Sequence, residues 1–96
     1  MAGWLQAEYR GYQAWIDDRV VAYCLYRDNG PHHYLRHLFV NRDFRRQGIA
    51  TALLDWMYAN IWTDKKVRLD VFVHNESAIV FYKQYGFETR VLRMEK

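Results

Sequence analysis

The chain has 96 residues; 51% of them are hydrophobic, and four Trp, eight Tyr and five Phe supply the aromatic side chains. This length fits one domain with one core, and the composition excludes a disordered tail, a collagen-like fibre and a low-complexity linker. Fourteen Lys and Arg against eleven Asp and Glu give a net charge of +3, which is compatible with any anionic partner, from nucleic acid to a phosphorylated cofactor.

The single cysteine, Cys24, excludes an internal disulfide and a zinc site built from several cysteines. It lies in an apolar, strand-like run, so we expect a buried and chemically inert thiol. No run approaches the roughly 20 apolar residues of a membrane helix, and the first residues do not have the pattern of a secretory signal peptide. The sequence therefore predicts a soluble, cytoplasmic protein.

The first half of the chain has the composition of three strands joined by short turns. Residues 12–16 alternate aromatic and small side chains, and residues 20–27 are rich in β-branched and aromatic residues. A strong breaker at residues 28–31 separates the second run from a third at residues 33–40. These runs predict an antiparallel meander. Residues 4–10 are either a lead-in strand or an extension of the first strand.

The pattern changes in the second half. Apolar side chains recur at helical spacing over residues 50–61, and residues 67–73 then alternate as in a strand. Asn75 stands where the N-cap of a second helix belongs, and Gly86 is its expected end. Residues 89–95 are predicted to form a last strand. The expected order of elements is therefore β-β-β-α-β-α-β.

The strand–helix–strand unit over residues 33–73 has to be a crossover, because only a crossover joins two parallel neighbours. We therefore expect one α/β domain over residues 1–96. In it, an antiparallel meander feeds one parallel strand pair, and helices lie on the faces of a mixed sheet.

The loop between the third strand and the first helix carries the most chemical information. A helix start has four backbone N–H groups without an internal partner and a partial positive charge. Gly48 lets a ligand approach this backbone closely, and Arg45 and Arg46 add full charges. The loop therefore predicts an anion site that suits a pyrophosphate. The alternative is an ordinary helix start with a solvated basic loop. The loop is not a P-loop, because Gly-Lys-Ser/Thr is absent, and it is not the dinucleotide fingerprint, because only Gly48 is present.

Two motifs give the sequence a family resemblance. The run Arg45-Arg46-Gln47-Gly48-Ile49-Ala50 resembles the acetyl-CoA signature Arg/Gln-x-x-Gly-x-Gly/Ala of the GNAT superfamily of N-acetyltransferases. Downstream, the run from Asn75 to Tyr82, with Tyr85-Gly86-Phe87 after it, is similar to that family's Asn-x-x-Ala-x-x-x-Tyr helix with its Gly-Phe ending. The motifs stand in the family's order, and the resemblance covers about residues 12–90.

The resemblance implies the family's acyl-CoA N-acyltransferase fold and an enzyme that transfers an acetyl group from acetyl-CoA to an amine by direct attack. The backbone of Leu38, Phe39 and Val40 would pair with the pantetheine arm like an added strand, and Asn75 would hydrogen-bond that arm. The main-chain N–H groups of seven residues would hold the pyrophosphate: Arg45, Arg46, Gln47, Gly48, Ile49, Ala50 and Thr51.

The same resemblance implies the catalytic groups. Tyr82 would contact the cofactor and protonate the departing CoA thiolate, and the Leu38 amide would donate to the developing oxyanion. Family members often carry a carboxylate just before Leu38, where this chain has His37. His37 could take the proton of the amine, since imidazole is a common general base, and a water relay to Asp70 or another acidic residue is an equal alternative. In purely structural terms, Tyr82 is a core aromatic and His37 a half-buried strand histidine.

The chain departs from the family pattern at both ends. The first strand and the two helices after it, which wall the acceptor site, are missing or reduced to residues 1–11, and nine residues follow Phe87. We therefore expect an acceptor site that is open or that a second subunit completes. Four tryptophans exceed the needs of a small core: Trp4, Trp15, Trp56 and Trp62. Together with an exposed sheet edge, they predict a homodimer.

Other interpretations of the sequence assign the protein a different ligand or no catalytic activity. A metal site at His32, His33 and His37 is not expected, because neighbouring strand residues point to opposite faces and residues four apart are separated by roughly 13 Å. Binding of single-stranded nucleic acid suits a basic, aromatic-rich chain, but the arginine pair is local and no RNA-binding signature is present. A non-catalytic acyl-CoA-binding module is a further alternative. The favoured reading is an enzyme that acts on a small-molecule or peptide amine, without a nucleic-acid or membrane partner.

Overall fold

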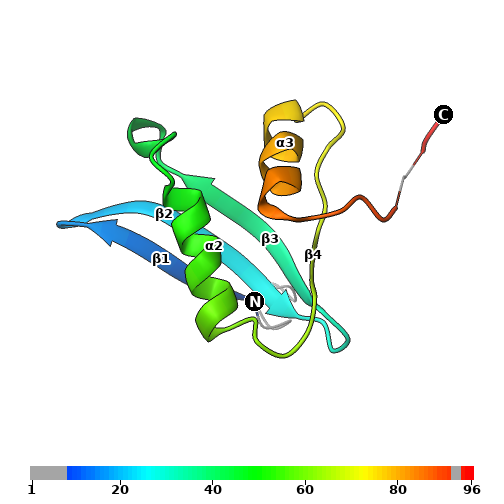
Figure 1. The fold of residues 1–96 in the computed structure, drawn as a ribbon, viewed down its shortest axis with the longest axis horizontal. Coiled ribbons are helices and arrows are strands. Elements are labelled where there is room, and N and C mark those ends of the chain that lie inside the picture. The colour runs from blue at the N-terminus through cyan, green and yellow to red at the C-terminus, as the bar shows by residue number, and fades with distance from the viewer. Residues whose placement is uncertain (1–8, 92–93) are drawn as a thin grey trace, which may run out of the picture.

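The computed structural model describes residues 9–91 and 94–96 (Figure 1). Its elements are β1 (Arg10–Ile16), β2 (Arg19–Asp28), β3 (His33–Val40), the 3-10 helix η1 (Arg42–Phe44), α2 (Ile49–Asn60), β4 (Val67–Leu69) and α3 (Glu76–Tyr85). The strand order is β1-β2-β3-β4; β1, β2 and β3 pair antiparallel, and β3 pairs parallel with β4. The predicted mixed sheet, with its meander and its parallel crossover, is confirmed.

Local sequence signals set the ends of both helices. Gly48, at φ 76°, precedes α2 in the left-handed conformation that glycine adopts without strain. The side-chain oxygen of Asn75 accepts a hydrogen bond from the Ala78 N–H at 3.3 Å and so caps the start of α3. Gly86, at φ 124°, ends α3, and its N–H donates to the carbonyl of Tyr82 at 3.1 Å. Both predicted helices are therefore confirmed.

One face of the sheet packs against α2 and forms the core, and α2 crosses the antiparallel strands in Figure 1. The buried residues of this core are Ala22, Cys24, Tyr26, Leu35, Leu53, Leu54, Met57 and Trp62. Cys24 has no exposed surface, and its burial raises the pKa of the thiol to about 11. The thiol is therefore protonated at neutral pH and serves as a core residue, as predicted.

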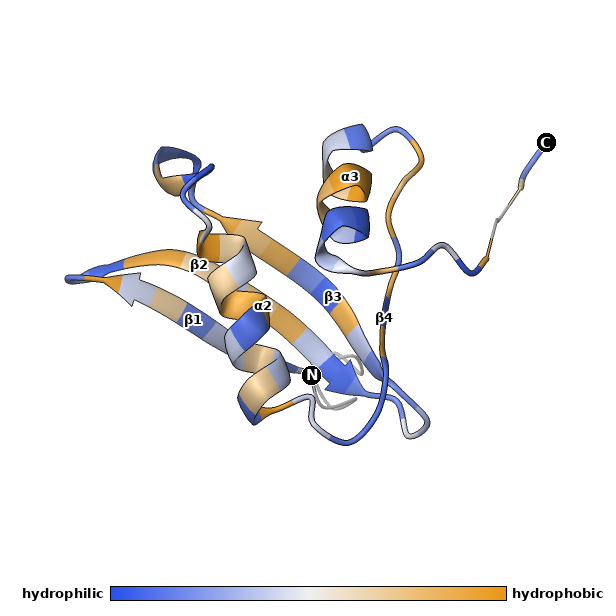
Figure 2. Cartoon of the chain, viewed as in Figure 1, coloured by the Kyte–Doolittle hydropathy of each residue, from blue (hydrophilic) through white to orange (hydrophobic). Residues whose placement is uncertain are grey.

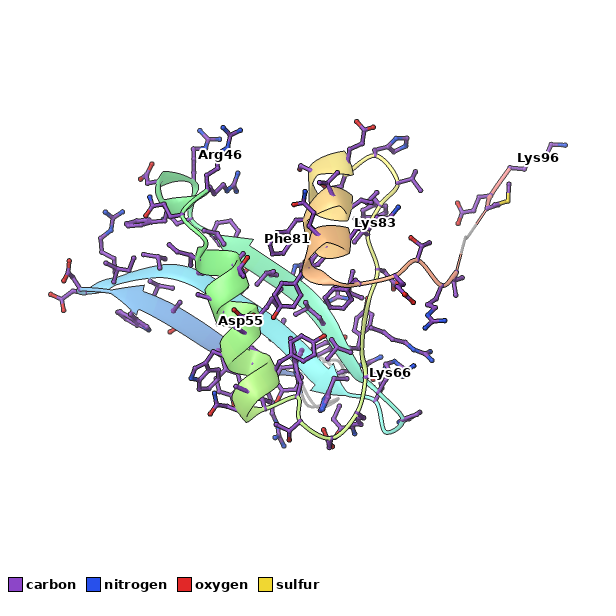
Figure 3. The ribbon with its side chains drawn as sticks, viewed as in Figure 1. Arg46, Asp55, Lys66, Phe81, Lys83 and Lys96 are labelled. Atoms are coloured by element: carbon purple, nitrogen blue, oxygen red, sulfur yellow. The ribbon has the colours of Figure 1, made fainter. Side chains whose placement is uncertain are left out.

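The second helix, α3, lies beside α2 and is attached to it through aromatic side chains. Phe81, Tyr82 and Tyr85 pack against the core while remaining half-buried. The hydroxyl of Tyr85 donates to Asp55 on α2 at 2.6 Å. Figure 3 shows Asp55 on α2 and Phe81 projecting from α3 toward it. Because no residue of α3 is fully buried, this helix is held mainly by ring contacts on one side.

The opposite face of the sheet has no helix over it in the part of the chain that the structure describes, and we call it the open face. Strand alternation places Tyr23 and Leu25 of β2 on this face, together with their cross-strand partners Phe39 and His37 of β3. The rings of Tyr23 and Phe39 lie 5.4 Å apart. Trp15 of β1 extends the face and is 57% exposed. The open face is therefore largely aromatic and in contact with solvent.

One predicted strand is shorter than expected and another is not formed among the described residues, because these segments lack a neighbouring strand. β4 ends at Leu69, although the alternation continues to residue 73. Residues 89–91 and 94–95 are not in a strand, and residues 92–93 lie outside the described residues. Phe72 and Val91 are 86% and 81% exposed. A period-two pattern favours an extended chain, but a strand forms only where a second strand pairs with it. The observed order is β-β-β-α-β-α.

Two further expectations concern the beginning of the chain and the tryptophans. The lead-in strand predicted for residues 4–10 lies largely outside the described residues, and Arg10 begins β1. Trp62 is not surplus, because it is 3% exposed and belongs to the core. Trp15 and Trp56 are exposed as expected, and Trp4 lies outside the described residues. Among the helices described, none has the length and apolarity needed to span a bilayer.

Candidate active site

The strands β3 and β4 pair over only three residues and then separate. Residues 33–35 pair with residues 67–69, and no pairing continues beyond them. In Figure 1, β3 runs to the upper left from this point, the chain after β4 runs upward, and α3 lies between the two in this view. We call the region between β3 and the chain after β4 the split. Beyond Leu35, the edge of β3 that faces the split has no strand beside it among the described residues.

The backbone groups that face the split follow from the ladder on the other side of β3. The Asn41 N–H donates to the Val21 carbonyl of β2 at 2.7 Å. Bonded and non-bonded positions alternate along an antiparallel pair, so Phe39 also bonds toward β2. Leu38 and Val40 therefore turn their N–H and C=O groups to the split. The Nε of Arg45 donates to the Val40 carbonyl at 3.1 Å, which leaves both groups of Leu38 and the Val40 N–H facing open space.

The start of α2 lies just beyond this edge and has no cap from a side chain. Its first turn contains no acidic residue, and the Ala52 N–H makes a helical bond to the Gly48 carbonyl at 2.9 Å. The N–H groups of Ile49, Ala50 and Thr51 precede that bond and have no partner within the helix. A Cβ on Gly48 would meet nothing within 4 Å. An anion can therefore approach these amides and the positive end of the helix dipole without obstruction.

Groups of the chain itself already compensate the free N–H groups and the positive partial charge at the start of α3. Asn75 caps it, the Ser77 hydroxyl donates to the Asn75 side-chain oxygen at 3.4 Å, and Glu76 adds a negative charge in the first turn. An anion therefore binds more favourably at the start of α2 than at the start of α3. Since the oxygen of Asn75 is engaged in the cap, its side-chain NH₂ is the group that can donate to a ligand.

The loop between β3 and α2 presents its backbone in a strained conformation. Arg46 has a φ of 64°, and a non-glycine residue in this region costs about 1–3 kcal/mol. With Gly48 at 76°, two left-handed residues turn nearby amides in an arrangement that often binds anions. Figure 2 shows the loop as hydrophilic beside the apolar end of β3, and Figure 3 shows Arg46 at its tip.

Tyr82 lies on α3 with its ring between two other aromatic rings. The ring centroids of Phe81 and Phe87 are 5.3 Å and 5.5 Å away, and both contacts are edge-to-face. Burial raises the pKa of the Tyr82 phenol above its ordinary value, so the hydroxyl keeps its proton at neutral pH. Its hydroxyl has no hydrogen-bond partner among the described residues, whereas the Tyr85 hydroxyl is held by Asp55. Of the two tyrosines on α3, Tyr82 is therefore the one whose hydroxyl is free to donate.

The two candidates for a base have different surroundings. His37 is exposed on the open face, opposite Leu25 and next to Leu38 in the chain. Asp70 follows β4 and accepts a hydrogen bond from the Tyr34 hydroxyl at 3.0 Å. His33, by contrast, is buried on the core side, where its Nε2 lies 2.9 Å from Asp64. His33 and His37 therefore lie on opposite faces, and no metal-binding group of three His, Cys, Asp or Glu occurs among the described residues.

The sequence analysis missed a pair of arginines on the open face. Arg27 lies over the ring of Tyr9 at 5.3 Å, and Arg36 lies over the same ring at 5.7 Å. The two residues are distant in the sequence, and an extra residue in β3 interrupts the β2–β3 register between them. A signal was nevertheless present, because both flank the breaker at residues 28–31 in a predicted meander.

The structure places residues 38–40 at the end of β3, residues 45–51 in the loop and first turn of α2 that follow it, and Asn75 at the start of α3. Tyr82 projects from the second turn of α3. His37 directly precedes Leu38, and its side chain lies on the open face, opposite to the core side on which Tyr82 packs.

Comparisons with known proteins all indicate the same family. The sequence profile described as the acetyltransferase (GNAT) family matches residues 2–87. An uncharacterized N-acetyltransferase of Methanocaldococcus jannaschii is 37% identical over 84 residues, which are 84% of this chain and 54% of that protein. The chain therefore spans about half the length of this relative.

Solved structures resemble the fold. Ard1 of Thermoplasma volcanium has 29% identity and a TM-score of 0.71, over 79% of this chain and 53% of its own. AAC(6′)-Iy, solved in complex with the bisubstrate analogue CoA-S-monomethyl-acetylneamine, has 22% identity and a TM-score of 0.74, over 96% of this chain and 72% of its own. At this identity the second likeness concerns the fold alone.

Proposed function

Because this chain belongs to the acetyltransferase (GNAT) family, we propose that it binds acetyl-CoA in the split and transfers the acetyl group to an amine. The observation that carries the proposal is the position of an uncapped helix start directly after a strand with an unpaired edge. A coenzyme A thioester has a pyrophosphate joined to an extended amide-containing arm. The helix start suits the pyrophosphate, and the strand edge suits the arm.

Each part of the cofactor has a matching group on the protein. The amides of residues 45–51 hold the pyrophosphate, with the guanidinium of Arg46 nearby in solvent. The pantetheine amides pair with Leu38 and Val40 as an added strand would. The side-chain NH₂ of Asn75 donates to the same arm from the other side of the split.

When bound, acetyl-CoA supplies the thioester, whose C–S bond breaks as the C–N bond to the amine forms. The Leu38 N–H donates to the carbonyl oxygen as negative charge develops on it, and a donor of this kind typically contributes about 100-fold or more to the rate. Tyr82 donates its proton toward the sulfur that leaves. His37 takes a proton from the amine and passes it to solvent, since it is exposed beside Leu38.

Acetyl-CoA binding is the first expected result. At about a hundredfold excess over Kd, a ligand specific for the folded state stabilises it by roughly 2.7 kcal/mol, which raises the Tm of a domain of this size by roughly 10–20 °C. A thermal-shift measurement checks this value. Acetylpantetheine, which lacks the pyrophosphate, is the matched control and should shift the Tm far less. Equal shifts from the two compounds would contradict the assignment of the helix start.

A release assay for free thiol, with a panel of amines, tests the transfer step. Binding without turnover would favour the non-catalytic acyl-CoA-binding module. Binding of an oligonucleotide without any response to acetyl-CoA would favour the RNA-binding alternative. The proposed location is the cytoplasm, where acetyl-CoA is available and a free thiol such as Cys24 stays reduced. Neither a nucleic acid nor a membrane is part of the proposal.

We also propose that the protein is a homodimer that associates through β1. Within the described residues, β1 is an edge strand of the sheet. Trp15 borders this edge on the open face, and Trp56 borders it on the helix face, where its ring lies 5.3 Å from Tyr12. Trp15 and Trp56 are 57% and 46% exposed. An unpaired edge with apolar residues on both sides favours pairing with a second copy.

The dimer is expected to break when a charge is placed on this border. Trp15→Lys should yield a monomer, because a lysine on an edge strand opposes edge-to-edge pairing. Light scattering over a range of concentrations measures the change. Val80→Lys is the control, because Val80 is an exposed apolar residue of similar accessibility (53%) on α3. A wild-type protein that stays monomeric at high concentration would remove the proposal.

A further inference from the structure

The arginine pair on the open face has no carboxylate partner among the described residues. Arg27 lies over Tyr9 at 5.3 Å and over Tyr34 at 5.9 Å, and Arg36 lies over Tyr9 at 5.7 Å. The ion pairs between described residues include neither arginine. The Nε of Arg27 is buried without a hydrogen-bond partner. Two guanidinium groups therefore flank one ring, and one of them has an unsatisfied donor.

This arrangement is unfavourable unless an anion joins it. Like charges held on one surface repel each other, and an unsatisfied buried donor costs about 1–3 kcal/mol. Stacking on aromatic rings orients each guanidinium as a planar fork, which matches the geometry of a carboxylate. Asp70 is the carboxylate at this border, and it is bound to the Tyr34 hydroxyl at 3.0 Å. Among the described residues, no carboxylate is paired with Arg27 or Arg36, so the carboxylate of a bound ligand can join the pair.

The position of the pair relates it to the reacting end of the split. The core side of β3 is covered, since Leu38 and Val40 pack against the core. An amine therefore reaches the Leu38 N–H from the open face, where His37 stands. Arg36 and Tyr34 precede Leu38 by two and four residues, which corresponds to about 7–13 Å along a strand. An extended peptide of two to four residues covers that distance.

We propose that the acceptor is the N-terminal amine of an acidic peptide, with a carboxylate two to four residues from that amine bound between Arg27 and Arg36. This inference rests on the proposed acetyltransferase function and adds the class of its acceptor. Polycationic acceptors such as polyamines are disfavoured, because the same arginines repel them. The route to the site leaves β1 free, so the proposed dimer and the acceptor use different surfaces.

The transfer on this acceptor is balanced by groups that the chain supplies. The nitrogen lone pair of the peptide N-terminus forms a bond to the acetyl carbonyl carbon, and the C–S bond breaks with its electron pair on sulfur. One proton passes from the nitrogen to His37 and then to solvent. One proton passes from Tyr82 to the sulfur, and solvent returns it. The products are an N-acetylated peptide and free coenzyme A.

Three peptide amides test the proposal: Ala-Ala-Glu-Glu, its neutral isostere Ala-Ala-Gln-Gln and the cationic Ala-Ala-Lys-Lys, with acetylation of the N-terminal amine read by mass spectrometry. The acidic peptide should have a kcat/KM about ten- to a hundredfold above that of the glutamine peptide, as expected when one charge-assisted contact is gained. The lysine peptide should be the poorest. In the double variant Arg27→Gln/Arg36→Gln, the acidic and glutamine peptides should become equal, with the KM for acetyl-CoA unchanged. Arg90→Gln removes one positive charge, from an arginine paired with Glu88, and is the control for the loss of an arginine away from this pair.

Calorimetry separates this inference from the proposed function. Titration of the acidic peptide into the protein without acetyl-CoA should give heat in the wild type and in Arg90→Gln, and none in the double variant. Titration of acetyl-CoA alone measures the cofactor site. Cofactor binding with no preference for the acidic peptide would overturn the acceptor assignment and leave the function standing. A preference that survives in the double variant would overturn it as well.

Discussion

Replacing Gly48 with valine should abolish measurable acetyl-CoA binding. Gly48 has a φ of 76°, and a β-branched residue there costs about 1–3 kcal/mol, so the turn changes conformation or the helix start frays. The new side chain also stands in the open space through which a pyrophosphate reaches the amides of Ile49 and Ala50. The loss of two charge-assisted hydrogen bonds raises Kd by about 100-fold or more. Isothermal calorimetry with acetyl-CoA measures the change.

A matched glycine elsewhere provides the control for backbone strain. Gly30 has a φ of 91°, and a Cβ there would also meet nothing within 4 Å. It lies in the loop before β3, at the end of the strand away from the start of α2. Gly30→Val should lower the free energy of unfolding about as much as Gly48→Val does, and leave the Kd unchanged. If both variants bind acetyl-CoA equally well, the assignment of the pyrophosphate site is wrong.

The second large effect is expected on kcat, when the hydroxyl of Tyr82 is removed. Tyr82→Phe should lower kcat by about 10- to 100-fold, at the low end of the usual range for general acids, because a thiolate leaves without full protonation. The KM for acetyl-CoA should change little, since the ring still packs between Phe81 and Phe87. Thiol release under saturating substrates measures kcat. Full activity in the variant at all pH values would exclude the acid role.

The pH dependence follows from the direction of the pKa shift. Burial raises the pKa of Tyr82, and the protonated form is the active one. The contribution of Tyr82 is therefore constant through neutral pH and is lost only as the pH rises above the ordinary phenol value of about 10. Tyr58→Phe is the control, because burial also raises the pKa of this half-buried phenol on α2. It should keep the wild-type kcat and the same pH profile.

The sequence predicted most of the fold because its signals are local. The bounds of β3 agree at both ends, Asn75 and Gly86 mark the ends of α3, and the crossover follows from the strand–helix–strand order. The errors lie in segments whose side chains alternate as in a strand but which have no neighbouring strand to pair with. The alternation through Val73 predicts a strand, yet β3 has already turned away from this segment. The alternating pattern of one segment therefore does not show how far a neighbouring strand continues beside it.

For the candidate site, too, the sequence predicted some features and missed others. A family motif marks residues 45–51, and the structure adds the reason, which is a helix start without a cap. The register of β2 and β3 shows that Leu38 and Val40, rather than Phe39, direct their backbone groups to the split. The sequence alone does not show which residues of β3 bond to β2 and which direct their backbone groups to the split. The pair of Arg27 and Arg36 was missed because it depends on an irregularity in the register of the neighbouring strands β2 and β3, which the sequence does not show.

The early parting of β3 and β4 has a consequence for how long the protein survives. Among the described residues, the segment after Leu69 is joined to the body by aromatic rings and by two tyrosine–aspartate hydrogen bonds, Tyr34 to Asp70 and Tyr85 to Asp55, without a backbone ladder. Segments attached in this way open more easily than the rest of a fold and are cut first by proteases. Coenzyme bound across the gap would fasten this segment, so the supply of coenzyme would govern the lifetime of the molecule as well as its rate.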